Sequence, residues 1–178
     1  MKDKLQKAFV LFVIGALSGL SIWAVNLATV DQIALNIKEK EDGYYKEIFD
    51  IDLSVEITTE EIEVEDGLFE VEIMTGSEED GFTTVGYAYK GSKKNNYGDI
   101  TVLVGIEDSK IKAVIISDTS NTPNFVKKIE KEYLHQFVEQ MTSNVSFDTK
   151  TGASYTYGSV TEVVTESVTY YNTERGAE

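Results

Sequence analysis

An uncharged apolar run, AFVLFVIGALSGLSIWAVNLATV, extends from Ala8 to Val30 near the amino terminus of the chain. Its 23 residues are enough for an α-helix to cross about 30 Å of hydrocarbon at about 1.5 Å per residue. The run therefore predicts one transmembrane helix. A cleaved signal peptide is the alternative, because Lys2, Lys4 and Lys7 precede the run. The length of the run and the lack of a small-x-small cleavage site after it favour the anchor.

The charges on either side of the run predict its orientation. Three lysines precede it and an acidic flank begins at Asp31, so the positive-inside rule places the amino terminus in the cytoplasm of a cell-membrane protein. We divide the chain into a cytoplasmic tip with the transmembrane helix (1–30), a juxtamembrane helical stalk (31–50) and an extracytoplasmic domain (51–178). The stalk is predicted from apolar residues at helical spacing, Val30, Ile33, Ala34 and Ile37, and should end near Gly43.

The charge and composition of the chain exclude several classes of function. The net charge is −15, and because residues 1–7 carry +2, the rest of the chain carries −17. Such an acidic domain is repelled by phosphate backbones, which argues against nucleic-acid binding. The chain has no Cys and a single His, His135, so disulfides, iron–sulfur clusters, cysteine nucleophiles and zinc clusters are excluded. Its chemistry must come from oxygen ligands, hydroxyls or a cofactor.

The middle of the chain has the pattern of an antiparallel sheet. Apolar and polar residues alternate in segments rich in β-branched and aromatic types, with Asp66-Gly67 and Asp108-Ser109 at predicted turns. The segments are LSVEIT, IEVED, LFEVEIM, FTTVGYAY, ITVLVGIE and KIKAVIIS.

Two later segments have helical periodicity, which makes the predicted fold class α+β. Pro123 opens the first, which extends to Met141 with apolar residues at every fourth position, and His135 lies off this stripe, as expected of a surface residue. In the second, the 3.6-residue period favours a helix whereas the β-branched composition favours a strand. Its apolar face would contain Val160, Val163, Val164, Ser167, Val168 and Tyr171.

Five hydroxyl side chains and two glycines crowd the stretch FDTKTGASYTYGSV, from Phe147 to Val160. If a helix begins around Tyr157, Ser154 and Thr156 lie at its amino end, where backbone N–H groups and the helix dipole favour a phosphate. Gly152 and Ala153 have little or no side chain, so they would leave room for a ligand that approaches the backbone. In isolation such residues are ordinary caps and turns. The stretch also lacks the spacing of a hydrolase elbow and the Lys of a P-loop.

Residues 148–156, DTKTGASYT, resemble the D-x-x-[S/T]-G-A-[T/S]-x-[T/S] signature of proteins that carry covalently bound FMN. The resemblance implies that a flavin transferase joins the FMN phosphate to the hydroxyl of Ser154. The usual attachment residue is Thr, so the sequence leaves open whether Ser154, Thr156 or no residue is modified. The other cofactor-binding residues implied by the signature are Asp148, Thr151, Gly152, Ala153, Tyr155 and Thr156.

The resemblance continues upstream of the signature. Residues 96–100, NYGDI, are similar to the family's G-Y-G-G-x-I, and residues 121–124, NTPN, are similar to its E-T-P-G-L-G element. This places Asn121 and Thr122 near the flavin, although Asn121 stands where the family has Glu and Asn124-Phe125 where it has Gly-Leu. Four tyrosines are candidates to stack on the flavin ring, with packing as the alternative role: Tyr87, Tyr97, Tyr155 and Tyr157.

The short length and single span are most similar to the G subunit of the Rnf complex, an ion-translocating ferredoxin:NAD oxidoreductase, and next to the C subunit of the sodium-pumping NADH:quinone oxidoreductase. The resemblance implies a flavoprotein electron-transport subunit that is not catalytic alone. Its partners would be the other membrane subunits of a translocase and a flavin transferase. The alternatives are a stand-alone extracytoplasmic FMN-binding electron carrier and a non-redox anchored binding domain.

Overall fold

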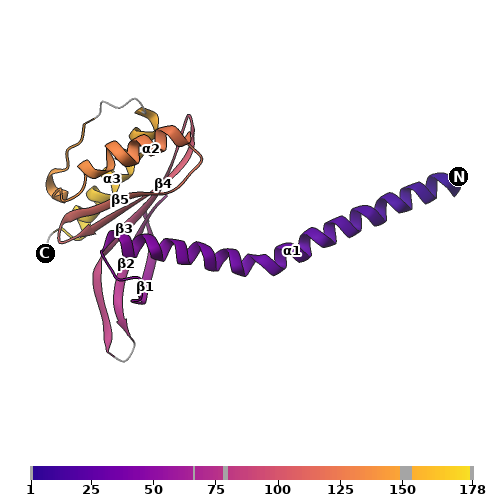
Figure 1. Ribbon diagram of the computed structural model, residues 1–178, viewed down its shortest axis with the longest axis horizontal. Coiled ribbons are helices and arrows are strands. Elements are labelled where there is room, and N and C mark those ends of the chain that lie inside the picture. The colour runs from indigo at the N-terminus through magenta and orange to yellow at the C-terminus, as the bar shows by residue number, and fades with distance from the viewer. Residues whose placement is uncertain (1, 66, 78–79, 149–153, 177–178) are drawn as a thin grey trace. The chain divides into compact units, whose positions relative to one another are not determined.

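The computed structural model describes residues 2–65, 67–77, 80–148 and 154–176 (Figure 1). The chain divides into two compact units, residues 1–41 and residues 42–178. A long helix is followed by five strands and further helices, which confirms the predicted α+β class. The elements are α1 (Lys2–Ile48), β1 (Ile57–Glu65), β2 (Leu68–Ser77), β3 (Gly81–Asn95), β4 (Gly98–Glu107), β5 (Lys110–Thr119), α2 (Pro123–Glu132), η1 (Leu134–Gln136), η2 (Thr142–Asn144) and α3 (Ser154–Glu174).

The first unit is the greater part of α1, and it has the properties of a membrane span. Among the described residues, α1 is the one helix long and apolar enough to cross a membrane. Its hydroxyl side chains bond inside the helix: Ser21 donates to the Leu17 carbonyl at 2.8 Å, and Thr29 to that of Val25 at 2.9 Å. Such internal bonds leave fewer polar groups facing hydrocarbon.

The second unit is built on a five-stranded antiparallel sheet in the order β1-β2-β3-β4-β5. The predicted turn at Asp108-Ser109 connects β4 and β5 with φ values of 50° and 59°, as a tight hairpin requires. The first strand begins at Ile57 rather than at Leu53, because the Asp52 carboxylate accepts bonds from the N–H and the hydroxyl of Ser54 and holds a turn there. Asp66 lies outside the described residues.

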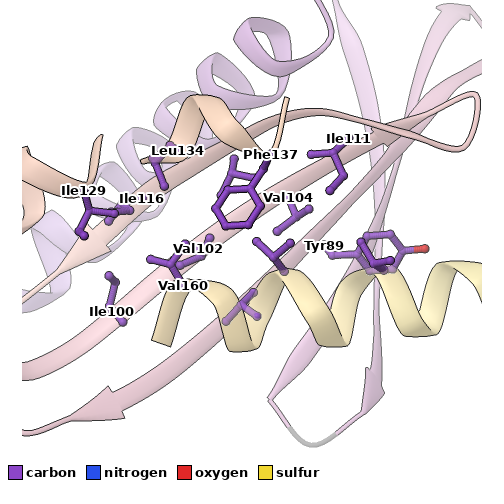
Figure 2. Packing of buried hydrophobic residues seen from close by; sticks show 14 of the residues in the cluster. Tyr89, Ile100, Val102, Val104, Ile111, Ile116, Ile129, Leu134, Phe137 and Val160 are labelled. Carbon is purple, nitrogen blue, oxygen red and sulfur yellow. The ribbon is translucent and has the colours of Figure 1, made fainter. Parts of the chain in front are cut away.

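Helices α2 and α3 cover one face of this sheet (Figure 1). Side chains from β3, β4 and β5 point toward α3 and toward the segment that follows α2 (Figure 2). Phe137 and Val160 are fully buried in this cluster. Its largest fully buried members on the strands are Leu68, Tyr89, Ile100, Val102, Val104, Ile106 and Ile111.

The last segment, for which the sequence left helix and strand as alternatives, forms a helix. Every residue of the predicted apolar face of α3 is buried, which confirms the helical period. The hydroxyl side chains bond to carbonyls one turn earlier: Ser167 donates to Val163 and Thr165 donates to Thr161, each at 2.7 Å. The β-branched side chains therefore pack while the hydroxyls are satisfied within the helix, and burial outweighs the intrinsic preference for strand.

The end of α1 packs on the opposite face of the sheet. Tyr45, Ile48 and Phe49 are buried against a second cluster that includes Val71, Ile73, Ala88 and Leu103. Gly43 lies inside α1, which ends five residues later at Ile48, within the predicted stalk over 31–50. An interior glycine costs about 1 kcal/mol, and burial of these large side chains offsets that cost.

Helix α2 ends at Glu132, nine residues before the predicted end at Met141. The later residues bond to the edge strand β5 instead of continuing the helix. Glu139 donates to the Ile111 carbonyl at 2.8 Å, and Ile111 donates to that of Gln140 at 3.0 Å. Glu139 has a φ of 63°, outside the helical region. His135 is exposed, as predicted.

Candidate functional site

Three segments distant in sequence meet at the amino end of α3. A buried chain of hydrogen bonds joins them: Thr156 Oγ1 donates to Asn121 Oδ1 at 3.0 Å, and Asn121 Nδ2 donates to the Asp99 carbonyl at 3.0 Å. The Thr156 and Asn121 side chains are 0% and 4% exposed. The start of α3, the residue before α2 and the start of β4 are therefore held in one arrangement.

The turn between β3 and β4 is bound closely to the segment that leads into α2. The Asp99 N–H donates to Ser120 Oγ at 2.8 Å, and the Ser120 N–H donates to the Asp99 carbonyl at 2.9 Å. Gly98 has a φ of 127°, and a Cβ there would clash with Ser120 Oγ. Glycine is therefore required at this position for both conformation and space.

Ser154 is the first residue of α3 and is exposed. Helix α3 has 21 residues, so its amino end has the positive partial charge of a full helix dipole and first-turn N–H groups without carbonyl partners in the helix. A phosphate on the Ser154 hydroxyl would lie in this favourable field. The donor set at this end of the helix thus fits an esterified phosphate.

Three aromatic rings from three elements lie beside this helix end. The Tyr97 ring centroid is 5.1 Å from that of Phe125 and 5.8 Å from that of Tyr155, both in edge-to-face geometry. Tyr97 is 42% exposed and Tyr155 is 56% exposed. Exposed rings of this kind offer an apolar surface to a planar aromatic ligand.

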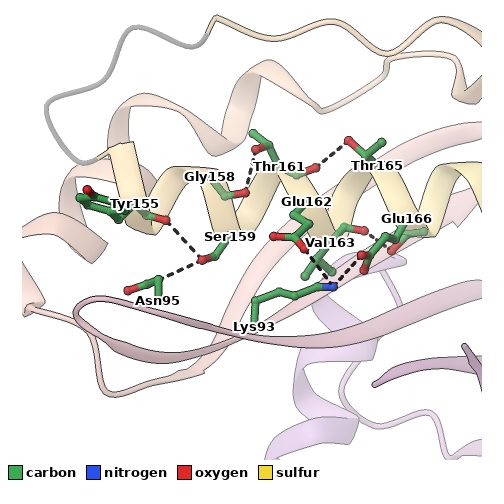
Figure 3. A network of polar contacts seen from close by, with 11 residues as sticks. Lys93, Asn95, Tyr155, Gly158, Ser159, Thr161, Glu162, Val163, Thr165 and Glu166 are labelled. Atoms are coloured by element: carbon green, nitrogen blue, oxygen red, sulfur yellow. Dashed lines mark hydrogen bonds and ion pairs between the residues drawn. The ribbon is translucent and has the colours of Figure 1, made fainter. Parts of the chain in front are cut away.

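Polar contacts between β3 and α3 fix the position of the helix (Figure 3). Lys93 Nζ lies 2.6 Å from Glu166 Oε1 and 3.3 Å from Glu162 Oε1. Burial opposes charge on Lys93, but its hydrogen bonds to these two glutamates give the lysine a raised pKa overall. Asn95 Nδ2 donates to Ser159 Oγ at 3.0 Å, and Ser159 Oγ donates to the Tyr155 carbonyl at 3.3 Å.

The other predicted site residues do not share this hydrogen-bonded arrangement at the start of α3. Asp148 is exposed and its N–H donates to Gln136 Oε1 at 2.8 Å. Thr122 is exposed and occupies the N-cap position of α2, where its side chain makes no capping hydrogen bond. Thr151, Gly152 and Ala153 lie outside the described residues. The structure thus brings Asn121, Thr156 and Tyr155 together at the start of α3.

Two of the four candidate stacking tyrosines lie elsewhere. Tyr157 is 3% exposed and belongs to the core, and burial raises its pKa to about 12. Tyr87 pairs with Ile106, at the far end of the β3–β4 hairpin from its turn, and the Arg175 guanidinium lies 3.9 Å from its ring centroid. Both have the packing role that the sequence left as the alternative.

Sequence reasoning missed Asn95 and Ser159 as parts of this region. The position of Asn95 just before a two-residue turn is typical of an Asx turn and was an available signal. The partner of Ser159 lies 64 residues away, and no local pattern indicates it.

One comparison with known proteins concerns this part of the chain. Residues 96–169 match the family model described as the FMN-binding domain. No curated protein matches the chain. The matched range includes Tyr97, Asn121, Phe125 and the first sixteen residues of α3. This part of the chain is therefore similar to FMN-binding domains.

Proposed function

We propose that this protein is a membrane-anchored flavoprotein that carries FMN as a phosphoester on Ser154 and relays electrons as a subunit of an Rnf-type ion-translocating complex. The observation that carries the proposal is the position of Ser154. Its exposed side chain starts a long helix inside the matched FMN-binding range, beside two exposed tyrosine rings.

The geometry favours Ser154 over Thr156 as the attachment residue. The Thr156 hydroxyl is fully buried and donates to Asn121 Oδ1, so a transferase cannot reach it without opening this part of the fold. Esterification would also leave the buried Asn121 oxygen without its donor, which costs about 1–3 kcal/mol. The Ser154 side chain is exposed at the first position of α3, where a transferase can reach it.

Attachment at Ser154 is a phosphoryl-type substitution. Ser154 Oγ forms a bond to the phosphorus of the FMN moiety, the bond from phosphorus to the leaving group of an activated flavin nucleotide breaks, and the hydroxyl proton is released. The protein gains the mass of FMN less one water. Bound FMN supplies the electron-transfer chemistry, while the residues of this chain hold the phosphate, pack beside the ring and limit its contact with water.

The anchor gives this attachment a physical purpose. With the domain outside the membrane, a dissociating flavin would be lost to the medium, whereas a phosphoester on an anchored helix keeps it at the membrane surface. The −17 charge of the chain beyond residue 7 also keeps the domain soluble beside anionic headgroups.

The attachment is tested by co-expressing the protein with a flavin transferase and measuring intact mass and in-gel flavin fluorescence after denaturation. We expect a gain equal to FMN less one water in the wild type and in Thr156→Ser, none in Ser154→Ala, and an equal or greater modified fraction in Ser154→Thr. Modification that persists in Ser154→Ala but is lost in Thr156→Val would contradict the proposed attachment residue. An unmodified wild type, under conditions that modify Ser154→Thr, would show that Ser154 is not a substrate.

Membership of an Rnf-type complex needs a separate experiment. The tagged full-length protein is purified in mild detergent from its native membrane, and we expect other membrane subunits to co-purify along with ferredoxin:NAD oxidoreductase activity. Recovery of the flavinylated protein alone, from membranes that retain this activity in another fraction, would favour a stand-alone electron carrier.

A further inference from the structure

We propose that Asn95 is a positioning residue that sets the spacing between the Tyr97 and Tyr155 rings, and so controls how the flavin lies at the proposed site. The inference rests on the proposed function. Asn95 precedes the matched FMN-binding range by one residue, and its side chain is hydrogen-bonded both to the β3–β4 turn and to α3.

Asn95 holds both tyrosines through backbone groups. Its Oδ1 accepts from the Tyr97 N–H at 2.9 Å, which fixes the turn that carries the Tyr97 ring. Its Nδ2 donates to Ser159 Oγ at 3.0 Å, and Ser159 Oγ in turn donates to the Tyr155 carbonyl at 3.3 Å. Figure 3 shows this path from Asn95 through Ser159 to Tyr155.

The hydrogen-bond path from Tyr97 to Tyr155 uses both the acceptor and the donor of the Asn95 side-chain amide. Asparagine presents an acceptor and a donor on adjacent atoms, so one side chain can satisfy the turn and the helix together. Aspartate keeps the acceptor for the Tyr97 N–H but has no donor for Ser159. A bond to the new carboxylate would use the one Ser159 hydroxyl proton, which then no longer reaches the Tyr155 carbonyl. Asn95→Asp therefore separates the connection to α3 from the local turn.

The helix itself remains attached without Asn95. Lys93 contacts Glu162 and Glu166, and Val160, Val163 and Val164 are fully buried in the core. Loss of the Asn95–Ser159 bond should therefore leave the fold intact and change mainly the ring separation, which is 5.8 Å between centroids.

The fluorescence, visible circular dichroism and midpoint potential of a flavin bound at this site should depend on the spacing between the Tyr97 and Tyr155 rings. On the flavinylated full-length protein in detergent, we measure modified fraction, flavin fluorescence, visible circular dichroism and midpoint potential for the wild type, Asn95→Asp and Ser159→Ala. The expected result is an unchanged modified fraction, flavin fluorescence raised by loss of ring contact, weaker visible dichroism and a shifted potential. Tyr97→Leu should give the same fluorescence change. The matched control is Ser92→Ala, because Ser92 lies on the same strand and its hydroxyl bonds to Thr101 instead.

A second measurement does not need the flavin. In unmodified protein, NMR contacts between the Tyr97 and Tyr155 rings should be present in the wild type and in Ser92→Ala and lost in Asn95→Asp. If these contacts and the flavin signals persist in Asn95→Asp while Tyr97→Leu changes the flavin signals, Asn95 is not a positioning residue. If the wild type shows the ring contacts but is never flavinylated, the proposed function fails and the structural role of Asn95 stands.

Discussion

Thr156 donates a hydrogen bond to Asn121 across 3.0 Å, between two side chains that are 35 residues apart and both buried. The bond connects the first turn of α3 to the residues that lead into α2. Because each partner would otherwise be a buried unsatisfied group, the bond specifies how the two helices meet at the proposed FMN site.

Replacement of Thr156 by Val tests this bond with little change of shape. Asn121 Oδ1 then loses its buried donor, so we expect unfolding in urea to require about 1–3 kcal/mol less free energy. Flavin attachment at Ser154 should persist in the remaining folded protein, as measured by intact mass. Thr165→Val is the control, because its hydroxyl is on an exposed residue and bonds within the helix. Equal stability of the two variants would show that the Asn121 contact contributes little.

This bond also marks the limit of what the sequence predicted. The strand-rich middle of the chain and the buried face of α3 follow from local periodicity, although the six predicted strand segments become five strands because LSVEIT and IEVED both contribute to β1. The pairing of Thr156 with Asn121 depends on how segments meet, and neither residue indicates the other locally. The early end of α2 has the same origin, since Glu139 and Gln140 bond to Ile111 of β5. Long-range backbone pairing thus overrides a good helical pattern.

The raised pKa of Tyr157 predicts that the folded protein loses stability at high pH. Its pKa rises from an ordinary value of 10.0 to about 12 in the folded protein, chiefly because of burial and secondarily because of the negative charge of Asp148. The folded state therefore holds this proton to higher pH than the unfolded state. The resulting stabilisation is fully present below about pH 10 and is lost as pH rises toward about 12.

Urea unfolding measured across this pH range tests the prediction. One such tyrosine contributes a slope of about −1.4 kcal/mol per pH unit, and Tyr157→Phe should remove that part of the slope. Tyr89 is also buried and has a raised pKa, with Glu70 as its hydrogen-bond acceptor, so a residual slope should remain. Tyr155→Phe, on an exposed side chain, is the control, and an equal change in both variants would contradict the assignment.

Glu70 and Arg175 form a largely shielded ion pair at the carboxyl end of α3. Arg175 Nη2 lies 2.7 Å from Glu70 Oε1, and Glu70 Oε2 accepts from the Tyr89 hydroxyl at 2.7 Å. Glu70 is only 3% exposed, so Arg175→Met leaves a buried charge with one donor. We expect a loss of about 2 kcal/mol, below the range for fully buried pairs because the Arg175 side chain is partly exposed.

The control for this prediction is Lys110→Met. Its partner Glu139 lies 3.6 Å away, and both side chains are well exposed. Little change in stability is expected there. If Arg175→Met unfolds at the same urea concentration as the wild type, Glu70 must become protonated or hydrated at low cost in the variant.

The membrane orientation is testable because the chain has no Cys, so one introduced Cys is a unique label site. In intact cells, a membrane-impermeant maleimide should modify Lys127→Cys on exposed α2 and should modify Gln6→Cys only after the cells are opened. Gln6 is chosen because its replacement keeps the three lysines that set the orientation. The opposite labelling pattern would place residues 42–178 in the cytoplasm.

Gly105 and Gly86 make room for the end of α1 on the sheet. A Cβ at Gly105 would clash with Ile48, and one at Gly86 would clash with Phe49. Gly105→Ala should therefore force apart two surfaces packed at core density, and we expect a loss of about 1–3 kcal/mol in the free energy of unfolding measured in urea.

Gly158→Ala is the opposite control. Gly158 lies inside α3 and a Cβ there meets nothing within 4 Å, so alanine should add about 0.5–1 kcal/mol of stability. Hydrogen exchange should also become faster in residues 44–48 of Gly105→Ala alone, because the end of α1 is held on the sheet by this contact. Unchanged exchange there would mean that α1 shifts along the sheet without losing its packing.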